Sequence, residues 1–306
     1  MSESHFRRAV ALVIVAATAA TAATAATAAT AGAASGQTAA PSGDFGGGAI
    51  ALPVKETTVA KDMLLSIRAG SDGRIGVDGQ IYARCGLGTI SGDGRIGSEG
   101  RFTVRGDVTR RPLVGTRHTS TFVVTGTLTP EGGEGTANVR LRVRTKGRAT
   151  RTCTSRTVSW TVRRPVAAAA AAPGPAAATL YGLTSQSAAR AKQAIVLRAA
   201  SGGRRVERAV FGYRAACDRG RIVESDDVNI SPEFDVAADG SFREVERFKA
   251  TFADVIVRTT VVLNGQFDAA GNAAGKLSVT ERYSSRRSGK RVDVCSTGTR
   301  SWSARQ

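Results

Sequence analysis

The sequence predicts an all-β protein with two tandem, duplicated β-sandwich domains, joined by an Ala/Pro linker and preceded by a signal peptide. Apolar and polar residues alternate with a period of two in several segments, such as residues 139–144, which is typical of half-buried strands. Short runs rich in Val, Thr and Phe are separated by Gly, Asp and Asn, and the same motifs occur twice in the same order. Each domain is therefore expected to form two packed sheets, in a jelly-roll or Greek-key arrangement.

Residues 1–34 predict a secretory signal peptide that ends in an Ala/Thr tract. Arg7 and Arg8 form a basic start, residues 9–17 form a short apolar core, and an Ala-Gly-Ala cleavage pattern stands at residues 31–33. The apolar core is shorter than a bilayer span requires, so a cleaved signal is favoured over an uncleaved anchor. We therefore expect a secreted or otherwise extracytoplasmic protein, with no membrane span in its mature form and with association at the cell surface left open.

The rest of the chain contains the same sequence design twice. Gly126 and Gly135 of the first copy match Gly265 and Gly275 of the second copy. Each copy ends with a cysteine, six further residues and a tryptophan. These ordered matches predict an internal duplication.

The duplication divides the mature chain into domains at residues 45–165 and 179–306. Residues 166–178 between them are Val, Ala, Pro and Gly only, a composition typical of a linker. Such a linker allows the domains either to pack together or to move independently. The sequence leaves the oligomeric state open in the same way.

The four cysteines predict one disulfide bond within each domain. Two cysteines lie in each copy at equivalent places, so the expected pairs in an exported protein are Cys85–Cys153 and Cys217–Cys295. Two cysteines per copy, with only two histidines in the whole chain, are too few for a zinc site. We therefore expect no bound metal and no cofactor.

The spacing of cysteine and tryptophan predicts a bulge near the end of each copy. Cys153 and Trp160 are seven residues apart, as are Cys295 and Trp302. An odd spacing places two residues on opposite faces of a regular strand, yet both residue types favour burial. One extra residue between them, near Ser155 in the first copy and at the equivalent place in the second, would bring both side chains into the core.

Five Asp-Gly or Asn-Gly dipeptides are expected to form tight turns. They begin at Asp72, Asp78, Asp93, Asp239 and Asn264. Carboxylates spaced six residues apart among glycines also permit a calcium site, although calcium-binding loops need more ligands at closer spacing. Hairpin turns are therefore the favoured interpretation.

The chain is strongly basic, with 43 Lys and Arg residues against 25 Asp and Glu residues and a formal net charge of +18. Such a charge favours polyanionic partners and surfaces. Where Val139 and Leu141 point into the core, the alternating arginines point outward together, about 6–7 Å apart along the strand. The candidate polyanion-binding residues are Arg140, Arg142, Arg144, Lys146 and Arg148.

The favoured function is an exported, non-enzymatic protein that binds anionic cell-envelope or extracellular polymers, such as an anionic polysaccharide or a cell-wall polymer, through this basic face of domain one. The plain alternative for the arginines is a solvated strand face. Nucleic acid is disfavoured as a partner because aromatic residues, which stack on bases, make up only 5% of the chain. We assign no catalytic residue.

Two other functions remain open from the sequence. One is a polysaccharide-active enzyme, a lyase or a hydrolase, that uses His118 in domain one, because His118 is the only histidine outside the predicted signal peptide. The other is a structural or protein-interaction module of the cell surface, which would carry an apolar patch on one sheet face.

Overall fold

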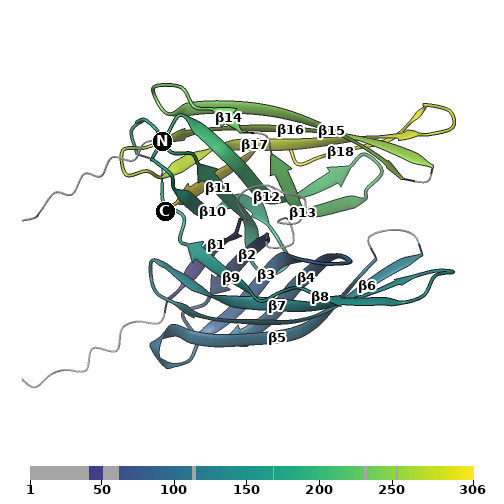
Figure 1. Ribbon diagram of the computed structural model, residues 1–306, viewed down its shortest axis with the longest axis horizontal. Coiled ribbons are helices and arrows are strands. Elements are labelled where there is room, and N and C mark those ends of the chain that lie inside the picture. Colours follow the sequence, from purple (N-terminus) through teal and green to yellow (C-terminus); the bar gives the residue numbers. More distant parts are fainter. Residues whose placement is uncertain (1–40, 51–61, 112–114, 168, 231–232, 253) are drawn as a thin grey trace, which may run out of the picture. The chain divides into compact units, whose positions relative to one another are not determined.

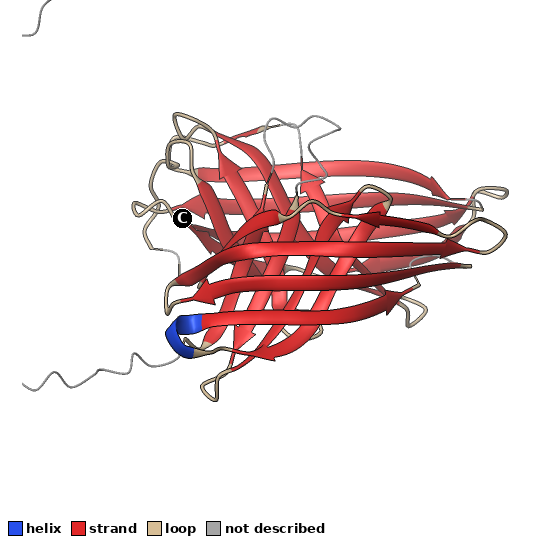
Figure 2. Ribbon diagram, turned by 60° about the horizontal axis from the view of Figure 1, so that its bottom comes forward, coloured by secondary structure: helices blue, strands red, loops and turns tan. Residues whose placement is uncertain are grey.

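The structure is a computed structural model that describes residues 41–306, except 51–61, 112–114, 168, 231–232 and 253, and except the side chains of 224–229. The predicted signal peptide lies outside the described residues. The described part consists almost entirely of strands, with one short 3-10 helix, η2 (Ser98–Gly100) (Figure 2). It contains no helix of the length and hydropathy that crossing a bilayer requires.

Two antiparallel sheets make up this part of the chain (Figure 1). The first sheet contains β1 (Gly43–Ala49), β2 (Met63–Ala69), β3 (Arg74–Ala83), β4 (Gly86–Arg95), β5 (Arg101–Arg110), β6 (Thr116–Leu128), β7 (Gly132–Thr145), β8 (Arg151–Thr154) and β9 (Val158–Arg163). The second sheet contains β10 (Thr179–Ser187), β11 (Lys192–Ala199), β12 (Arg205–Cys217), β13 (Ile222–Ile230), β14 (Phe234–Asp235), β15 (Ser241–Phe252), β16 (Val255–Phe267), β17 (Ala273–Ser285), β18 (Arg291–Ser296) and β19 (Arg300–Arg305).

The strand order is the same in the two sheets. The first sheet runs β4-β3-β2-β1-β9-β7-β6-β5, and the second runs β13-β12-β11-β10-β19-β17-β16-β15. Most strands that follow each other in the chain are hydrogen-bonded neighbours, which differs from the expected jelly-roll or Greek-key order. The physical reason is that short turns join these strands, and a short turn can connect only adjacent antiparallel strands.

Each sheet curves into a barrel-like shape, so that its two halves face each other across a core (Figure 1). In the first sheet, the Thr89 backbone N–H on β4 donates a hydrogen bond to the Ser120 hydroxyl on β6 at 3.0 Å. One continuous, folded sheet therefore encloses each core, where the sequence had suggested two separate sheets. The largest buried side chains include Phe45, Phe122 and Trp160 in the first core.

The expected extra residue is present between Cys153 and Trp160. Cys153 pairs with Leu141 and Val158 pairs with Ala137, so the chain between Cys153 and Val158 is one residue longer than the β7 segment opposite it. Because of this extra residue, the side chains of Cys153 and Trp160 lie on the same face of the sheet and both point into the core.

Polar side chains stabilise the bulge in both sheets. The Ser155 hydroxyl accepts a hydrogen bond from the Val139 backbone N–H at 2.9 Å, and Thr297 does the same for Val279 at 2.9 Å. Trp160 and Trp302 are only 2% and 3% exposed, so both tryptophans belong to the core as expected.

The predicted disulfide bonds Cys85–Cys153 and Cys217–Cys295 are both present. In the second sheet the two bonded cysteines face each other on β12 and β18. In the first sheet the bond joins the turn between β3 and β4 to β8.

The glycine dipeptides were interpreted only partly correctly. Those at Asp72 and Asp239 lie in turns, as expected. The other three lie inside strands, at Asp78 in β3, Asp93 in β4 and Asn264 in β16, so the prediction of turns at these places was wrong. The glycine of each dipeptide is required instead because neighbouring atoms leave no space for a side chain.

Two matched glycines show the reason. A Cβ on Gly126 would stand 2.4 Å from Cζ2 of Trp160, and a Cβ on Gly265 would stand 2.5 Å from Cζ2 of Trp302. No side chain fits in either place. Each tryptophan ring therefore reaches across the adjacent strand, β7 or β17, and packs directly on the backbone of the strand beyond it, β6 or β16.

The expected linker, residues 166–178, runs along the second sheet as far as the structure describes it. Ala171 forms a β-bridge with Asp268, and the Ala172 backbone N–H donates to the Phe267 carbonyl at 3.0 Å. The Ala169 backbone N–H donates to the Asp268 carboxylate at 3.3 Å. Hydrogen bonds therefore attach this segment to the sheet that follows it.

The two sheets also contact each other directly. Leu64 of the first sheet and Val196 and Val210 of the second share a small apolar cluster. Beside it, Arg208 on β12 and Asp62, next to β2, form an ion pair whose side chains are 1% and 4% exposed. Nη1 of Arg208 donates a hydrogen bond to the Asp62 carboxylate at 3.0 Å.

Replacing Asp62 with Ala should destabilise the protein strongly, because the Arg208 guanidinium would stay buried without this carboxylate. Removing one partner of a buried pair costs about 3–5 kcal/mol, so the free energy of unfolding in urea should fall by about that amount. The double variant D62L/R208M should recover much of the loss. Replacing Glu99 removes an exposed pair with Arg101 and should cost at most about 1 kcal/mol. If D62A and E99A lowered the free energy of unfolding equally, the Asp62–Arg208 pair would not be the buried contact seen in the structure.

Replacing Gly126 with Ala should force the Trp160 ring and the β6 backbone apart. Overpacking of this kind costs about 1–3 kcal/mol, measurable as a lower urea midpoint. Gly97 is a matched control, because a Cβ there would meet nothing closer than 3.5 Å. A G126A variant as stable as G97A would show that the ring can move at little cost.

Candidate functional site

The candidate arginines lie on the outer face of the first sheet. Val139 and Leu141 on β7 are buried, whereas Arg140 and Arg142 between them are exposed. Arg144 continues the alternation, and the remaining two candidates, in the turn after β7, are also exposed. The period-two pattern thus places the β7 arginines in one row along the strand.

The neighbouring strand adds another arginine to the row. In the β6–β7 register Arg117 stands directly opposite Arg144, and Thr119 stands opposite Arg142. On the other side, β8 places Thr152 beside Arg142. We call the following set the first basic face: Arg117, Arg140, Arg142, Arg144, Lys146 and Arg148.

The first basic face has no internal counter-charge. None of its side chains forms an ion pair with a residue that the structure describes. The nearby Asp107 accepts a hydrogen bond from the Thr121 hydroxyl at 2.5 Å. Like charges directly opposite each other, as at Arg117 and Arg144, destabilise a sheet by roughly 0.2–1 kcal/mol. The repulsion between Arg117 and Arg144 lies at the surface, where an anion bound from outside would relieve it.

The geometry suits an extended ligand with repeated negative charges. A guanidinium group binds a carboxylate, sulfate or phosphate group through two parallel hydrogen bonds. Alternate residues of a strand repeat about every 6.6–6.8 Å, so the row presents one such group after another. Threonine hydroxyls beside the row offer neutral hydrogen bonds to sugar hydroxyls.

The sequence analysis missed a second row of cations. In the second sheet Lys249, Arg258 and Arg282 stand side by side across β15, β16 and β17. They come from three strands, so no spacing within one segment reveals them. The available signal was a buried neighbour before two of them, Val257 before Arg258 and Glu281 before Arg282, but Lys249 lacks one, and joining the three needs the register between strands.

His118 is flanked by an arginine and an apolar residue on the neighbouring strands. It lies half-buried on β6, between Arg110 on β5 and Val143 on β7. Burial lowers the pKa of the His118 imidazole below its ordinary value. Within the described part of the chain, no carboxylate forms a hydrogen bond or an ion pair with it.

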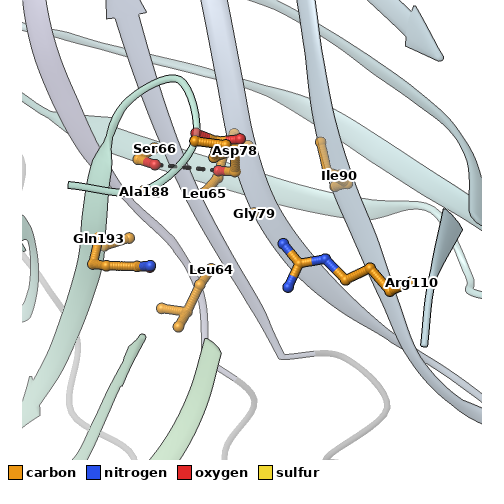
Figure 3. Close-up of a pocket in the computed structure, with 11 residues that line it drawn as sticks. Leu64, Leu65, Ser66, Asp78, Gly79, Ile90, Arg110, Ala188 and Gln193 are labelled. Carbon is orange, nitrogen blue, oxygen red and sulfur yellow. Dashed lines mark hydrogen bonds between the residues drawn. The ribbon is translucent and has the colours of Figure 1, made fainter. Parts of the chain in front are cut away.

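A small cavity between the two sheets is also unsuited to a substrate (Figure 3). Its lining includes Leu64, Asp78, Arg110 and Gln193. Its volume is about 20 Å³, which holds about one water molecule. The Asp78 carboxylate beside it already accepts a hydrogen bond from the Ala191 backbone N–H at 2.9 Å.

The acidic residues considered for calcium have cationic or backbone partners, and Asp78 and Asp93 both accept hydrogen bonds from Arg190. Asp72 accepts a hydrogen bond from the Arg74 backbone N–H at 3.0 Å, and Asp93 pairs with Arg190 at 2.9 Å. Cys217, Asp293 and Cys295 lie close together, but the two cysteines are bonded to each other and offer no thiolate. Each of these groups has a structural partner within the protein.

A buried polar network distinguishes the second core from the first. The Glu281 carboxylate accepts hydrogen bonds from the Tyr213 hydroxyl at 2.5 Å and from the Tyr283 hydroxyl at 2.6 Å. Burial and the Glu281 charge raise the pKa of Tyr283. Arg221 stacks on the Tyr283 ring, with 4.9 Å from its guanidinium carbon to the ring centroid. Both phenols use their protons to satisfy the carboxylate, so the network holds the fold.

The pKa of His118 gives a direct test of its environment. Its imidazole should titrate below about 6.5 in an NMR pH series, because burial disfavours the charged form. The folded state then binds this proton less readily than the unfolded state, so its contribution to stability is complete above about pH 6.5 and is lost as the pH falls. The H118Q variant identifies the signal. Titration above that value would indicate a nearby carboxylate and favour the enzyme alternative.

Comparisons with known proteins were made with the whole sequence. No protein-family model matches the chain, and no curated protein matches it. The geometry and charge of the first basic face therefore carry the functional argument.

Proposed function

We propose that the chain is an exported, non-enzymatic protein that binds anionic polysaccharides or cell-wall polymers through its first basic face. The observation that carries the proposal is the row of exposed arginines, in which Arg117 stands opposite Arg144 and none pairs with a carboxylate in the described part of the chain. A sheet surface that keeps like charges adjacent gains free energy when a polyanion covers it.

Two features support an exported protein. Disulfide bonds form and persist mainly in oxidising compartments outside the cytoplasm, and both cysteine pairs are bonded. The basic start and short apolar core of residues 1–34 support the same location. The proposal therefore places the protein where anionic envelope polymers are found.

The proposal includes two homologous domains produced by an internal duplication. The shared strand order, the matched tryptophan–glycine contacts and the hydroxyl that stabilises each bulge support it. The facing halves of each folded sheet would serve as the two layers of a sandwich. In this view the fold is common to both copies, and the charged outer surfaces differ between them.

A protein-interaction module is the second candidate, because two aromatic side chains are exposed on one strand. Phe248 and Phe252 on β15 are 37% and 47% exposed. They are too few to form a large apolar face, so polymer binding is the better supported function. An enzyme that uses His118 has less support, since no described carboxylate accompanies that residue.

Neutralising the arginine row should weaken binding to dextran sulfate and to polygalacturonate. The variant R140T/R142T/R144T should bind each immobilised polymer at least about tenfold more weakly, and the slope of log Kd against log salt should fall by about 2–3. The matched control, R84T/R95T/R219T, removes the same charge from exposed residues elsewhere. Equal loss in both variants would show that only the net charge matters, and no loss in either would refute the proposal.

A further inference from the structure

The second sheet also has a basic outer face. The registers of β15, β16 and β17 place six charged side chains on one face among the described residues, and all six are basic and exposed. We call this set the second basic face: Arg243, Arg247, Lys249, Arg258, Lys276 and Arg282. None of them forms an ion pair with a described residue.

The centre of this face is the row across the strands. Lys249 pairs with Arg258 in the β15–β16 register, and Arg258 pairs with Arg282 in the β16–β17 register. Neighbouring strands lie about 4.8 Å apart, so three cations are adjacent with no carboxylate between them. The Arg258 guanidinium has one neutral neighbour, the Ser284 hydroxyl at 3.5 Å.

An open groove of about 840 Å³ continues the second basic face toward the start of β15. Arg243, Lys276 and the Gln266 amide contribute to its lining. Asp235 also lines it, at the far end from Lys249, and its carboxylate lies 3.6 Å from the Arg205 guanidinium, which also pairs with Glu233. Cations beside neutral amides suit a polymer that carries both acidic groups and hydroxyls.

The two basic faces lie away from the contact between the sheets. That contact involves the outer side of β1–β3 and β10–β12, as in the Asp62–Arg208 pair. Within each sheet the opposite wall carries the basic face, because β4 packs on β6 and β7, and β12 packs on β17. The faces therefore point away from the shared contact and away from each other.

We propose that one molecule binds two anionic polymer chains at once, one on each basic face, and so cross-links them. This inference rests on the proposed function, since it needs the first basic face to bind such polymers. A single polymer could reach both basic faces only by passing around both sheets of the protein, whereas two separate polymers can each bind one face directly. Two sites on one body convert binding into bridging.

Agglutination of beads coated with dextran sulfate tests the bridging. The purified full chain should agglutinate the beads, and short sulfated oligosaccharides should bind with a stoichiometry of two per chain in calorimetry. The variant K249T/R258T/R282T should keep bead binding within about fivefold, need at least tenfold more protein to agglutinate, and bind one oligosaccharide. Two of its substitutions install the residues found at equivalent places in the first sheet, Thr109 and Thr119, so the strands should form normally.

The controls separate the two proposals. R140T/R142T/R144T should also lose agglutination and keep one oligosaccharide site, whereas R84T/R95T/R219T should behave as the wild type. If K249T/R258T/R282T still agglutinates beads and binds two oligosaccharides, the second basic face is not a site and bridging through it is refuted, while the proposed function stands. If the wild type binds neither beads nor oligosaccharide, the proposed function fails, and the bridging inference fails with it.

Discussion

The buried ion pair between Arg208 and Asp62 fixes how the two sheets are combined. Its side chains are almost fully excluded from solvent, and they come from positions far apart in the sequence. Two charges lose much of their hydration when buried, and only well-aligned hydrogen bonds offset that cost. Any sliding of one sheet over the other would break this buried pair. The pair therefore favours one relative position of the sheets more strongly than an apolar contact of similar size would.

A few close contacts keep each sheet curved around its own core. The matched glycines let each tryptophan ring reach across one strand and lie on the backbone of the next. The bulge after each second disulfide cysteine turns the chain so that cysteine and tryptophan share one side. The linker adds its own hydrogen bonds to the second sheet. The basic residues are thus carried on rigid strands, where their spacing is set by the backbone.

Features that depend on local periodicity could be predicted from the sequence. The disulfide pairs, the extra residue near Ser155 and the outward position of Arg140 follow from spacing within one segment or from the repeat. The strand order could not be predicted, because a period of two determines the faces of a strand but not its neighbours. For the same reason the cross-strand row through Arg258 was missed. The glycine after Asn264 was misread, because close packing and a tight turn both require glycine.

Each sheet joins its first strand to its last, with β1 beside β9 and β10 beside β19. This arrangement delays closure of the fold, because Gly46 cannot pair with Arg163 until the residues between them are available. Such long-range pairing makes folding slow compared with that of helical domains of similar size. In a chain that is still being completed, one edge of β10 therefore stays unpaired until β19 is available.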